Sequence, residues 1–222
     1  NAHLTSQWFA DQGFAVIVTD GRGTPGRGSE WERAVHGDLA TTPLDDQVEA
    51  LHAVAEQVGG LDLSRVAIRG WSFGGYLAAL AVLRRPDVFH AAVAGAPVTE
   101  WRLYDTHYTE RYLGNPADRA DAYDASSLLP LAPELSRPLL LIHGLADDNV
   151  VAAHTLQLSS ALLAAGRPHE VLPLLDRYAE TVHLAERFTG SRTFGHFTRG
   201  GSREEMEAIV WSEILAQPGK EI

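Results

Sequence analysis

Five short apolar runs alternate with amphipathic stretches along the chain. A continuous apolar run is typical of a strand that is buried on both faces of a parallel sheet, and residues 14–20 and 138–144 are expected to be such strands. Further strand-like runs occupy residues 66–68, 88–98 and 170–175. Amphipathic or otherwise helix-forming stretches cover residues 4–12, 43–58, 76–83, 152–165 and 203–215. Strands that alternate with helices predict an α/β fold, with a mostly parallel sheet and helices on both faces.

Composition adds little to this fold but restricts the partners. The 222 residues are enough for one large domain, and no repeat or internal boundary divides them. The formal net charge of −11 argues against nucleic acid or an anionic membrane as a partner, because both attract basic surfaces. No apolar run reaches the roughly 18 residues of a membrane-spanning helix. Cysteine is absent, which excludes thiol chemistry and leaves the cellular compartment open.

A glycine-rich loop follows the first predicted strand, over residues 20–28. It lacks the spacing of both the P-loop and the dinucleotide-binding fingerprint, so it does not indicate a phosphate site. Arg22 and Arg27 are therefore expected to be structural and to bind neighbouring carboxylates. The H-E-x-x-H spacing of a zinc site is also absent, and we expect neither a metal nor another cofactor.

The pattern G-x-S-x-G occupies residues 70–74, between the predicted strand 66–68 and the predicted helix 76–83. In a nucleophile elbow, a serine lies on such a strand-to-helix turn, which exposes its hydroxyl above the sheet. Ser72 is therefore the candidate nucleophile, and the backbone N–H of Phe73 is the candidate oxyanion donor. The alternative is that the glycines only mark a tight turn.

A serine nucleophile needs a base, and the base needs a group that orients it. In elbow hydrolases the acid follows the serine in the sequence and lies on a loop after a later strand. The loop after residues 138–144 contains Asp147, which we favour, and Asp148, which is the alternative. Either side chain could instead cap the helix that follows.

The base is expected after the strand at residues 170–175, where two of the ten histidines lie. His183 is in a stretch with the pattern of an amphipathic helix, whereas His196 is in a loop before the last predicted helix. A loop delivers an imidazole to the serine more easily than the middle of a helix does. His196 is therefore favoured over His183.

Three blocks of sequence together resemble the catalytic domain of the prolyl oligopeptidase family, most closely its dipeptidyl peptidase IV-like branch. They are residues 70–76 (GWSFGGY), 143–150 (HGLADDNV) and 96–112 (APVTEWRLYDTHYTERY). The first block alone would indicate only an α/β-hydrolase, but the three are specific as a set. The resemblance extends from about residue 8 to about residue 175.

This resemblance implies Ser72 as the nucleophile, Asp147 as the triad acid, and a homodimer formed through the hydrolase domain. It also implies a pocket for the side chain before the scissile bond, usually proline or alanine. The positions that match its lining are Phe73, Val98, Trp101, Tyr104, Tyr108 and Val150, and Asn149 matches the residue that hydrogen-bonds a substrate carbonyl. An aromatic box suits a flat, apolar pyrrolidine ring. The alternative is that these aromatic residues form the buried stripe of an ordinary helix.

We therefore expect residues 1–222 to be one α/β-hydrolase domain, truncated at its N-terminus, without the first strands of the family's sheet and without its β-propeller. The expected activity is that of a serine peptidase that releases N-terminal dipeptides, or cleaves peptides after proline or alanine, through an acyl-enzyme. One alternative is an esterase or acylaminoacyl peptidase with the same triad. Another is an inactive fragment that acts as an association module.

Overall fold

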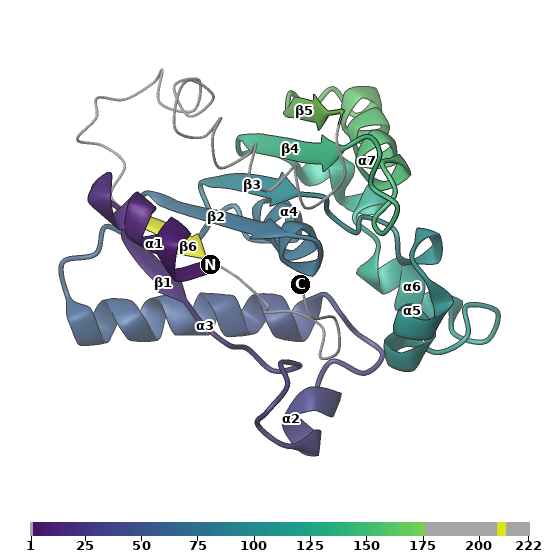
Figure 1. Ribbon diagram of the computed structural model, residues 1–222, viewed down its shortest axis with the longest axis horizontal. Helices are drawn as coiled ribbons and strands as arrows, with labels where there is room; N and C mark the ends of the chain where they lie inside the picture. The colour runs from purple at the N-terminus through teal and green to yellow at the C-terminus, as the bar shows by residue number, and fades with distance from the viewer. Residues whose placement is uncertain (1, 176–207, 212–222) are drawn as a thin grey trace.

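The computed structural model describes residues 2–175 and 208–211 (Figure 1). Within these residues, six strands form one sheet in the order β1-β6-β2-β3-β4-β5, and every pairing is parallel. The strands are β1 (Ala15–Val18), β2 (Val66–Trp71), β3 (Ala91–Gly95), β4 (Leu139–Gly144), β5 (Glu170–Leu174) and β6 (Ala208–Trp211). The sheet confirms the predicted parallel arrangement. The strands β1, β3, β4 and β5 each lie within a predicted strand run, whereas β2 begins with the run at residues 66–68 and continues to Trp71.

Seven α-helices and two short 3-10 helices accompany the sheet in the described part of the chain. The α-helices are α1 (Ala2–Asp11), α2 (Ser29–Arg33), α3 (Thr41–Val58), α4 (Phe73–Arg84), α5 (Thr106–Leu113), α6 (Ala120–Ser126) and α7 (Ala153–Ala164). The 3-10 helices are η1 (Trp101–Leu103) and η2 (Leu129–Glu134). Among the helices described, none has both the length and the apolar character that crossing a bilayer requires.

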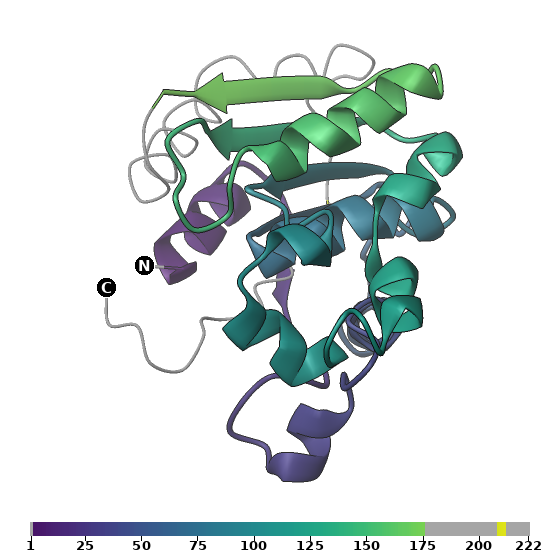
Figure 2. The same ribbon diagram turned by 90° about the vertical axis from the view of Figure 1, so that its right-hand side faces the viewer.

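Helices cover both faces of the sheet, as predicted. From β1 to β5 the chain advances across the sheet in one direction, so right-handed crossovers bring α3, α4 and α7 to the same face. Phe9 of α1 packs against Val16 and Ala67, whereas the adjacent Ile17 and Ile68 belong to the main core. Because side chains alternate along a strand, α1 lies on the opposite face. Figures 1 and 2 show this division.

The main core lies between the sheet and the helices α3 and α4. The α4 helix is buried at every position from Gly74 to Leu83, which is typical of a helix that is apolar on all sides. The α3 helix instead contributes one stripe, with buried side chains at Leu44, Val48 and Leu51. This packing anchors α4 directly behind the sheet, so that the turn at its N-terminus is rigidly placed.

The glycine-rich loop after β1 is held by ion pairs, as predicted for its two arginines. Arg22 donates from Nε to Asp46 Oδ1 over 2.9 Å, and its backbone N–H donates to the same carboxylate. The guanidinium of Arg27 lies 3.6 Å from a carboxylate oxygen of Asp20. Asp46 is near the start of α3, so the Arg22 contact fastens the loop to that helix.

The predicted helix over residues 203–215 is wrong at its centre, because Ala208–Trp211 form β6. This strand pairs with β1 on one side and with β2 on the other. The sequence AIVW is apolar and half β-branched, so periodicity alone cannot distinguish a buried strand from a helical segment. The strand conformation is decided by β1 and β2, whose facing backbone N–H and C=O groups both pair with β6. The local sequence of residues 208–211 contains no sign of this pairing.

Candidate active site

Ser72 lies on the turn between β2 and α4, in a backbone conformation that is rare for serine. Its φ is 57° and its ψ is −115°, and Ala96 is the only other non-glycine among the described residues with a positive φ. The Ser72 N–H donates to the carbonyl oxygen of Gly95 over 2.9 Å. Such a conformation costs roughly 1–3 kcal/mol and is typical of functional sites. It is the geometry expected of a nucleophile elbow.

The glycines around Ser72 are required by close packing. A Cβ atom at Gly70 would overlap the carbonyl group of Gly74, and one at Gly75 would overlap the carbonyl oxygen of Gly95. The backbone of α4 therefore approaches β2 and β3 more closely than any side chain would permit. The glycines do mark a tight turn, and this turn places Ser72 directly at the end of β2.

The Ser72 hydroxyl is not used for helix capping. Ser72 occupies the N-cap position of α4, but its side chain makes no capping hydrogen bond, although serine at this position usually does. The residue is half-buried. Phe73 is the first residue of α4, so its N–H has no acceptor within the helix. A hydroxyl and an adjacent backbone donor therefore lie together, as an acyl-transfer site requires.

Asp147 lies in the turn after β4 and is only 5% exposed, whereas Asp148 is exposed. Its Oδ1 accepts hydrogen bonds from the backbone N–H groups of Asn149 and Val150, over 3.0 and 2.9 Å. Its Oδ2 is buried and has no hydrogen-bond partner within the described residues. Neither aspartate caps α7, whose N-cap is Ala152. A buried carboxylate oxygen without a donor is unfavourable, so Oδ2 is suited to accept from an imidazole.

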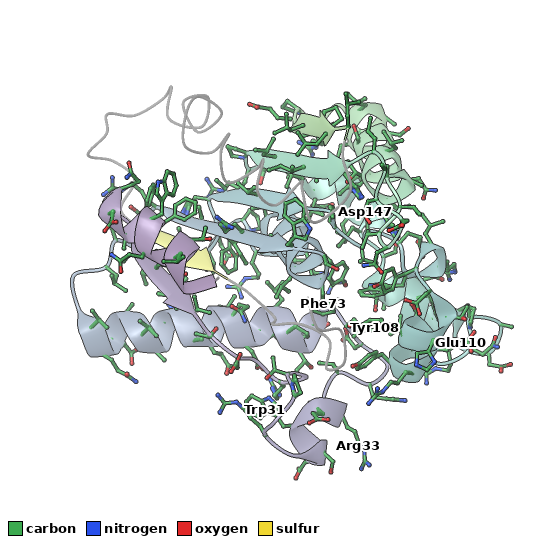
Figure 3. The ribbon with its side chains drawn as sticks, viewed as in Figure 1. Trp31, Arg33, Phe73, Tyr108, Glu110 and Asp147 are labelled. Carbon is green, nitrogen blue, oxygen red and sulfur yellow. The ribbon has the colours of Figure 1, made fainter. Side chains whose placement is uncertain are left out.

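The serine and the aspartate lie at the same edge of the sheet. Ser72 directly follows β2 and Asp147 follows β4, and β3 pairs with both of these strands. Figure 3 shows Phe73, Tyr108 and Asp147 at the end toward which the arrows of β2, β3 and β4 point. This carboxyl edge is where open α/β sheets bind their ligands.

The two candidate bases, His183 and His196, both lie outside the described residues. The preference for His196 therefore stays a prediction. Within residues 2–175 and 208–211, no group of three histidine, aspartate or glutamate side chains is placed to hold a metal ion.

Aromatic rings extend from the serine turn to α5. The ring centroid of Trp101 lies 5.8 Å from that of Phe73 and 5.4 Å from that of Tyr76. Trp101 also stacks on Tyr108, with centroids 6.1 Å apart and ring planes at 14°, and meets Tyr104 edge-on at 6.1 Å.

Burial raises the pKa of the Tyr76 and Tyr108 phenols, which stay neutral. Tyr76 was not among the predicted residues, although its position one turn after Phe73 is a signal for it.

These aromatic residues do not form the stripe of a single helix. The Glu100 side chain caps η1 by accepting from the Arg102 N–H over 3.1 Å. The Asp105 side chain caps α5 by accepting from the Tyr108 N–H over 2.9 Å. Between the two caps, Tyr104 is extended, with φ −93° and ψ 165°. The helix-stripe alternative is therefore wrong, and the rings converge from two separate elements.

The remaining predicted lining residues lie around these rings. Val98 and Val150 are 1% and 0% exposed, and they belong to the same hydrophobic cluster as Trp101 and Tyr104. Asn149 is exposed, and its Oδ1 accepts a hydrogen bond from the Tyr104 hydroxyl over 3.3 Å. The valines thus support the rings from inside, while the asparagine links them to the loop of Asp147.

Comparison with known proteins agrees with this geometry. The sequence model described as the prolyl oligopeptidase family matches residues 2–177. Dipeptidyl peptidase 8 of Mus musculus is 45% identical over 165 residues, which cover 73% of this chain and 18% of that protein. Dipeptidyl peptidase 4 of Bos taurus is 40% identical over 154 residues, or 68% of this chain and 20% of that protein. The chain therefore spans about a fifth of the length of these relatives.

A solved structure shows the same similarity in three dimensions. The crystal structure of Porphyromonas gingivalis dipeptidyl peptidase 4 matches with a TM-score of 0.71 and 37% sequence identity, over 77% of this chain and 25% of that chain. The α/β-hydrolase fold and the similarity to the dipeptidyl peptidase IV-like branch are thereby confirmed. On the evidence of its sequence, its parallel sheet and its strained serine turn, the chain belongs to the prolyl oligopeptidase family.

Proposed function

We propose that residues 1–222 are a single catalytic domain of a serine peptidase that releases dipeptides from the N-terminus of peptides with proline or alanine at the second position. The observation that carries this proposal is Ser72, held at φ 57° with a hydroxyl that caps no helix. Asp147 supports it, since its buried Oδ2 lies without a donor in the described part of the chain. The dipeptidyl peptidases named above supply the expected reaction class.

The proposed reaction proceeds through an acyl-enzyme. The Ser72 hydroxyl oxygen attacks the scissile carbonyl carbon while His196, the predicted base, takes the hydroxyl proton. The Phe73 N–H stabilises the oxyanion, and the base then transfers the proton to the leaving amine as the C–N bond breaks. Water, activated by the same base, hydrolyses the ester. Asp147 Oδ2 accepts from the imidazole throughout and holds it in one orientation.

The aromatic cluster is the proposed wall of the pocket for the second residue of the substrate. The rings of Trp101, Tyr104 and Tyr108 present flat apolar surface with little conformational freedom, which suits a pyrrolidine ring or a methyl group. Asn149, at the edge of these rings, is the proposed donor to the carbonyl of the preceding residue. Val98 and Val150 hold the rings in place without contacting solvent.

A substrate panel combined with a matched pair of variants tests this function. We expect the chain to cleave a Gly-Pro amide faster than an acetylated alanine amide or a short ester. Faster cleavage of the acetylated amide or the ester would instead favour an acylaminoacyl peptidase or an esterase. Asp147→Asn should reduce kcat by a factor on the order of 10⁴, whereas Asp148→Asn should stay within about twofold because its side chain is exposed.

A serine-reactive phosphonate tests the nucleophile directly. We expect it to label Ser72 in the folded chain and not in the Ser72→Ala variant, as read by mass spectrometry of the labelled peptide. A folded chain that the phosphonate leaves unlabelled would contradict the peptidase proposal and favour an association module.

The predicted homodimer is part of this proposal and has a candidate surface. Large apolar side chains are exposed on and around α7 and β5, which lie side by side (Figures 1 and 2). They include Leu145, Val151, Leu156, Leu163, Val171 and Leu175. Apolar side chains that gather on one surface are typical of an interface. Light scattering should give the mass of two chains, and Leu163→Glu should reduce it to one.

A further inference from the structure

Two buried histidines lie behind the candidate active site and have no role in the reaction described above. His143, near the end of β4, is 1% exposed, and His154, in the first turn of α7, is 0% exposed. Burial lowers the pKa of both imidazoles, to about 4 for His154. Both rings are therefore neutral near pH 7, but they contact different parts of the site.

The hydrogen bonds of His143 fix its tautomer. Its Nε2 lies 2.7 Å from the carbonyl oxygen of Val150. Since a carbonyl can only accept, Nε2 carries the hydrogen. In the neutral ring Nδ1 then has a lone pair, and it accepts from the Thr155 hydroxyl over 2.7 Å. The ring is thus held from both sides, by the loop after β4 and by α7.

Val150 connects this ring to the candidate acid. The same residue whose carbonyl accepts from His143 donates its own N–H to Asp147 Oδ1 over 2.9 Å. Val150 is fully buried, so its carbonyl would lose its partner in a dry environment if the imidazole were removed. Asp147 would keep the contact of its backbone N–H with the Gly144 carbonyl and that of its Oδ1 with the Asn149 N–H. The Val150 N–H that binds the same Oδ1 would no longer be held from its far side.

We propose that His143 is a positioning residue for the hydrolase reaction: it fixes Val150, and through it the orientation of the Asp147 carboxylate toward the catalytic base. This inference rests on the proposed function. A displacement of roughly 1 Å in a catalytic group can reduce the rate about a hundredfold. Loss of the Nε2 donor should therefore lower kcat by a similar factor.

Three variants separate positioning from simple stability. His143→Leu removes the donor and keeps most of the volume, so we expect kcat to fall on the order of a hundredfold. His143→Gln retains an N–H near the position of Nε2 and should recover at least about tenfold of that loss. The shorter side chain of His143→Asn does not reach Val150 and should not recover it. If the leucine variant fails to fold, the difference between Gln and Asn carries the test.

The pH profile of kcat/KM is the readout that a purely structural role would not change. A carboxylate raises the pKa of a neighbouring imidazole, so a misaligned Asp147 should move the acidic limb of the profile to lower pH in His143→Leu. The titratable groups near His143 are Asp147 and His154. His154→Leu is the matched control, because the Nδ1 atom of His154 accepts from the Glu100 N–H over 3.4 Å and not from the Asp147 loop. Its acidic limb should stay in place.

The outcomes distinguish this inference from the proposed function. If the phosphonate labels the wild-type chain but His143→Leu keeps its kcat and acidic limb, only the positioning role is overturned. Equal losses in His143→Gln and His143→Asn would overturn it too, as would a matching shift of the limb in His154→Leu. If the wild-type chain is not labelled at Ser72, the proposed function fails and this inference fails with it.

Discussion

The hydroxyl of Tyr104 donates a hydrogen bond to Oδ1 of Asn149, and the two atoms are 3.3 Å apart. This bond joins the segment after η1 to the loop that carries Asp147. Because the amide oxygen of Asn149 accepts this bond, we expect its NH₂ group to be the end that donates to a substrate. The ring of Tyr104 therefore forms part of the aromatic cluster and, at the same time, sets which end of the asparagine a substrate would meet.

Removing this hydroxyl should weaken substrate binding without slowing the chemical step. A neutral hydrogen bond contributes about 1 kcal/mol, so Tyr104→Phe should raise KM for a Gly-Pro amide roughly fivefold and leave kcat nearly unchanged. Tyr112→Phe is the control, since its ring packs on Tyr108 at the other end of the cluster. Steady-state kinetics of both variants would reveal the difference, and an equal KM in Tyr104→Phe and the wild type would contradict the role of the bond.

Ser72 should limit the stability of the fold. Glycine adopts a positive φ freely, whereas alanine at φ 57° keeps the strain of the native serine. Both Ser72→Gly and Ser72→Ala should be inactive. The glycine variant, however, should unfold at a higher temperature, with a gain of roughly 1 kcal/mol over alanine. Calorimetry of the two variants makes the comparison, and a lower melting temperature for the glycine variant would argue against backbone strain at this position.

Gly95 should be intolerant of any side chain because of the neighbouring strand. Gly95 and Trp71 are paired residues of β3 and β2, and a Cβ atom at Gly95 would overlap the Trp71 indole. We expect Gly95→Ala to reduce the free energy of unfolding by about 3 kcal/mol, the upper end of the usual range for overpacked sites. In a Trp71→Leu background the same substitution should have a smaller effect. A double-mutant cycle by urea denaturation measures the coupling, and additive effects would exclude the predicted overlap.

His154 should make the protein less stable in mild acid. Its pKa is lowered by burial from 6.5 to about 4, so the unfolded chain takes up a proton at a higher pH than the folded chain does. The free energy of unfolding should therefore fall as the pH drops from about 6.5 to about 4, by roughly 3 kcal/mol in full. Urea denaturation across this range should show a shallower decline in His154→Leu. An unchanged slope would mean that His154 does not titrate in this window.

Several parts of the site followed from the sequence because they depend on local chemistry. The glycines of the G-x-S-x-G turn reflect steric contacts within a few residues, so the position of Ser72 could be predicted directly. The strands β1, β3, β4 and β5 lie in mostly apolar runs, which are typical of a parallel sheet, although burial is complete along β4 and slight along β5. The order of strand, turn and helix then assigned Asp147 to the correct edge of the sheet.

Other features depend on residues that are distant in the sequence. Residues 147 and 148 are both aspartate, so the local sequence does not say which one is buried. Packing against Val150 and the end of β4 buries Asp147 and leaves Asp148 exposed. Similarly, the spacing of Trp101, Tyr104 and Tyr108 suits a helix, but the caps at Glu100 and Asp105 divide the segment in two.

The sequence by itself determined the alternation of strands and helices, the tight turn, and the positions of the candidate nucleophile and of the loop that carries the candidate acid. Only the tertiary structure decided that Ala208–Trp211 form a strand, and that His143 and Tyr104 each contact the loop of Asp147. The physical reason is that periodicity and steric limits act over a few residues, whereas a partner strand or a buried acceptor is supplied by the rest of the fold.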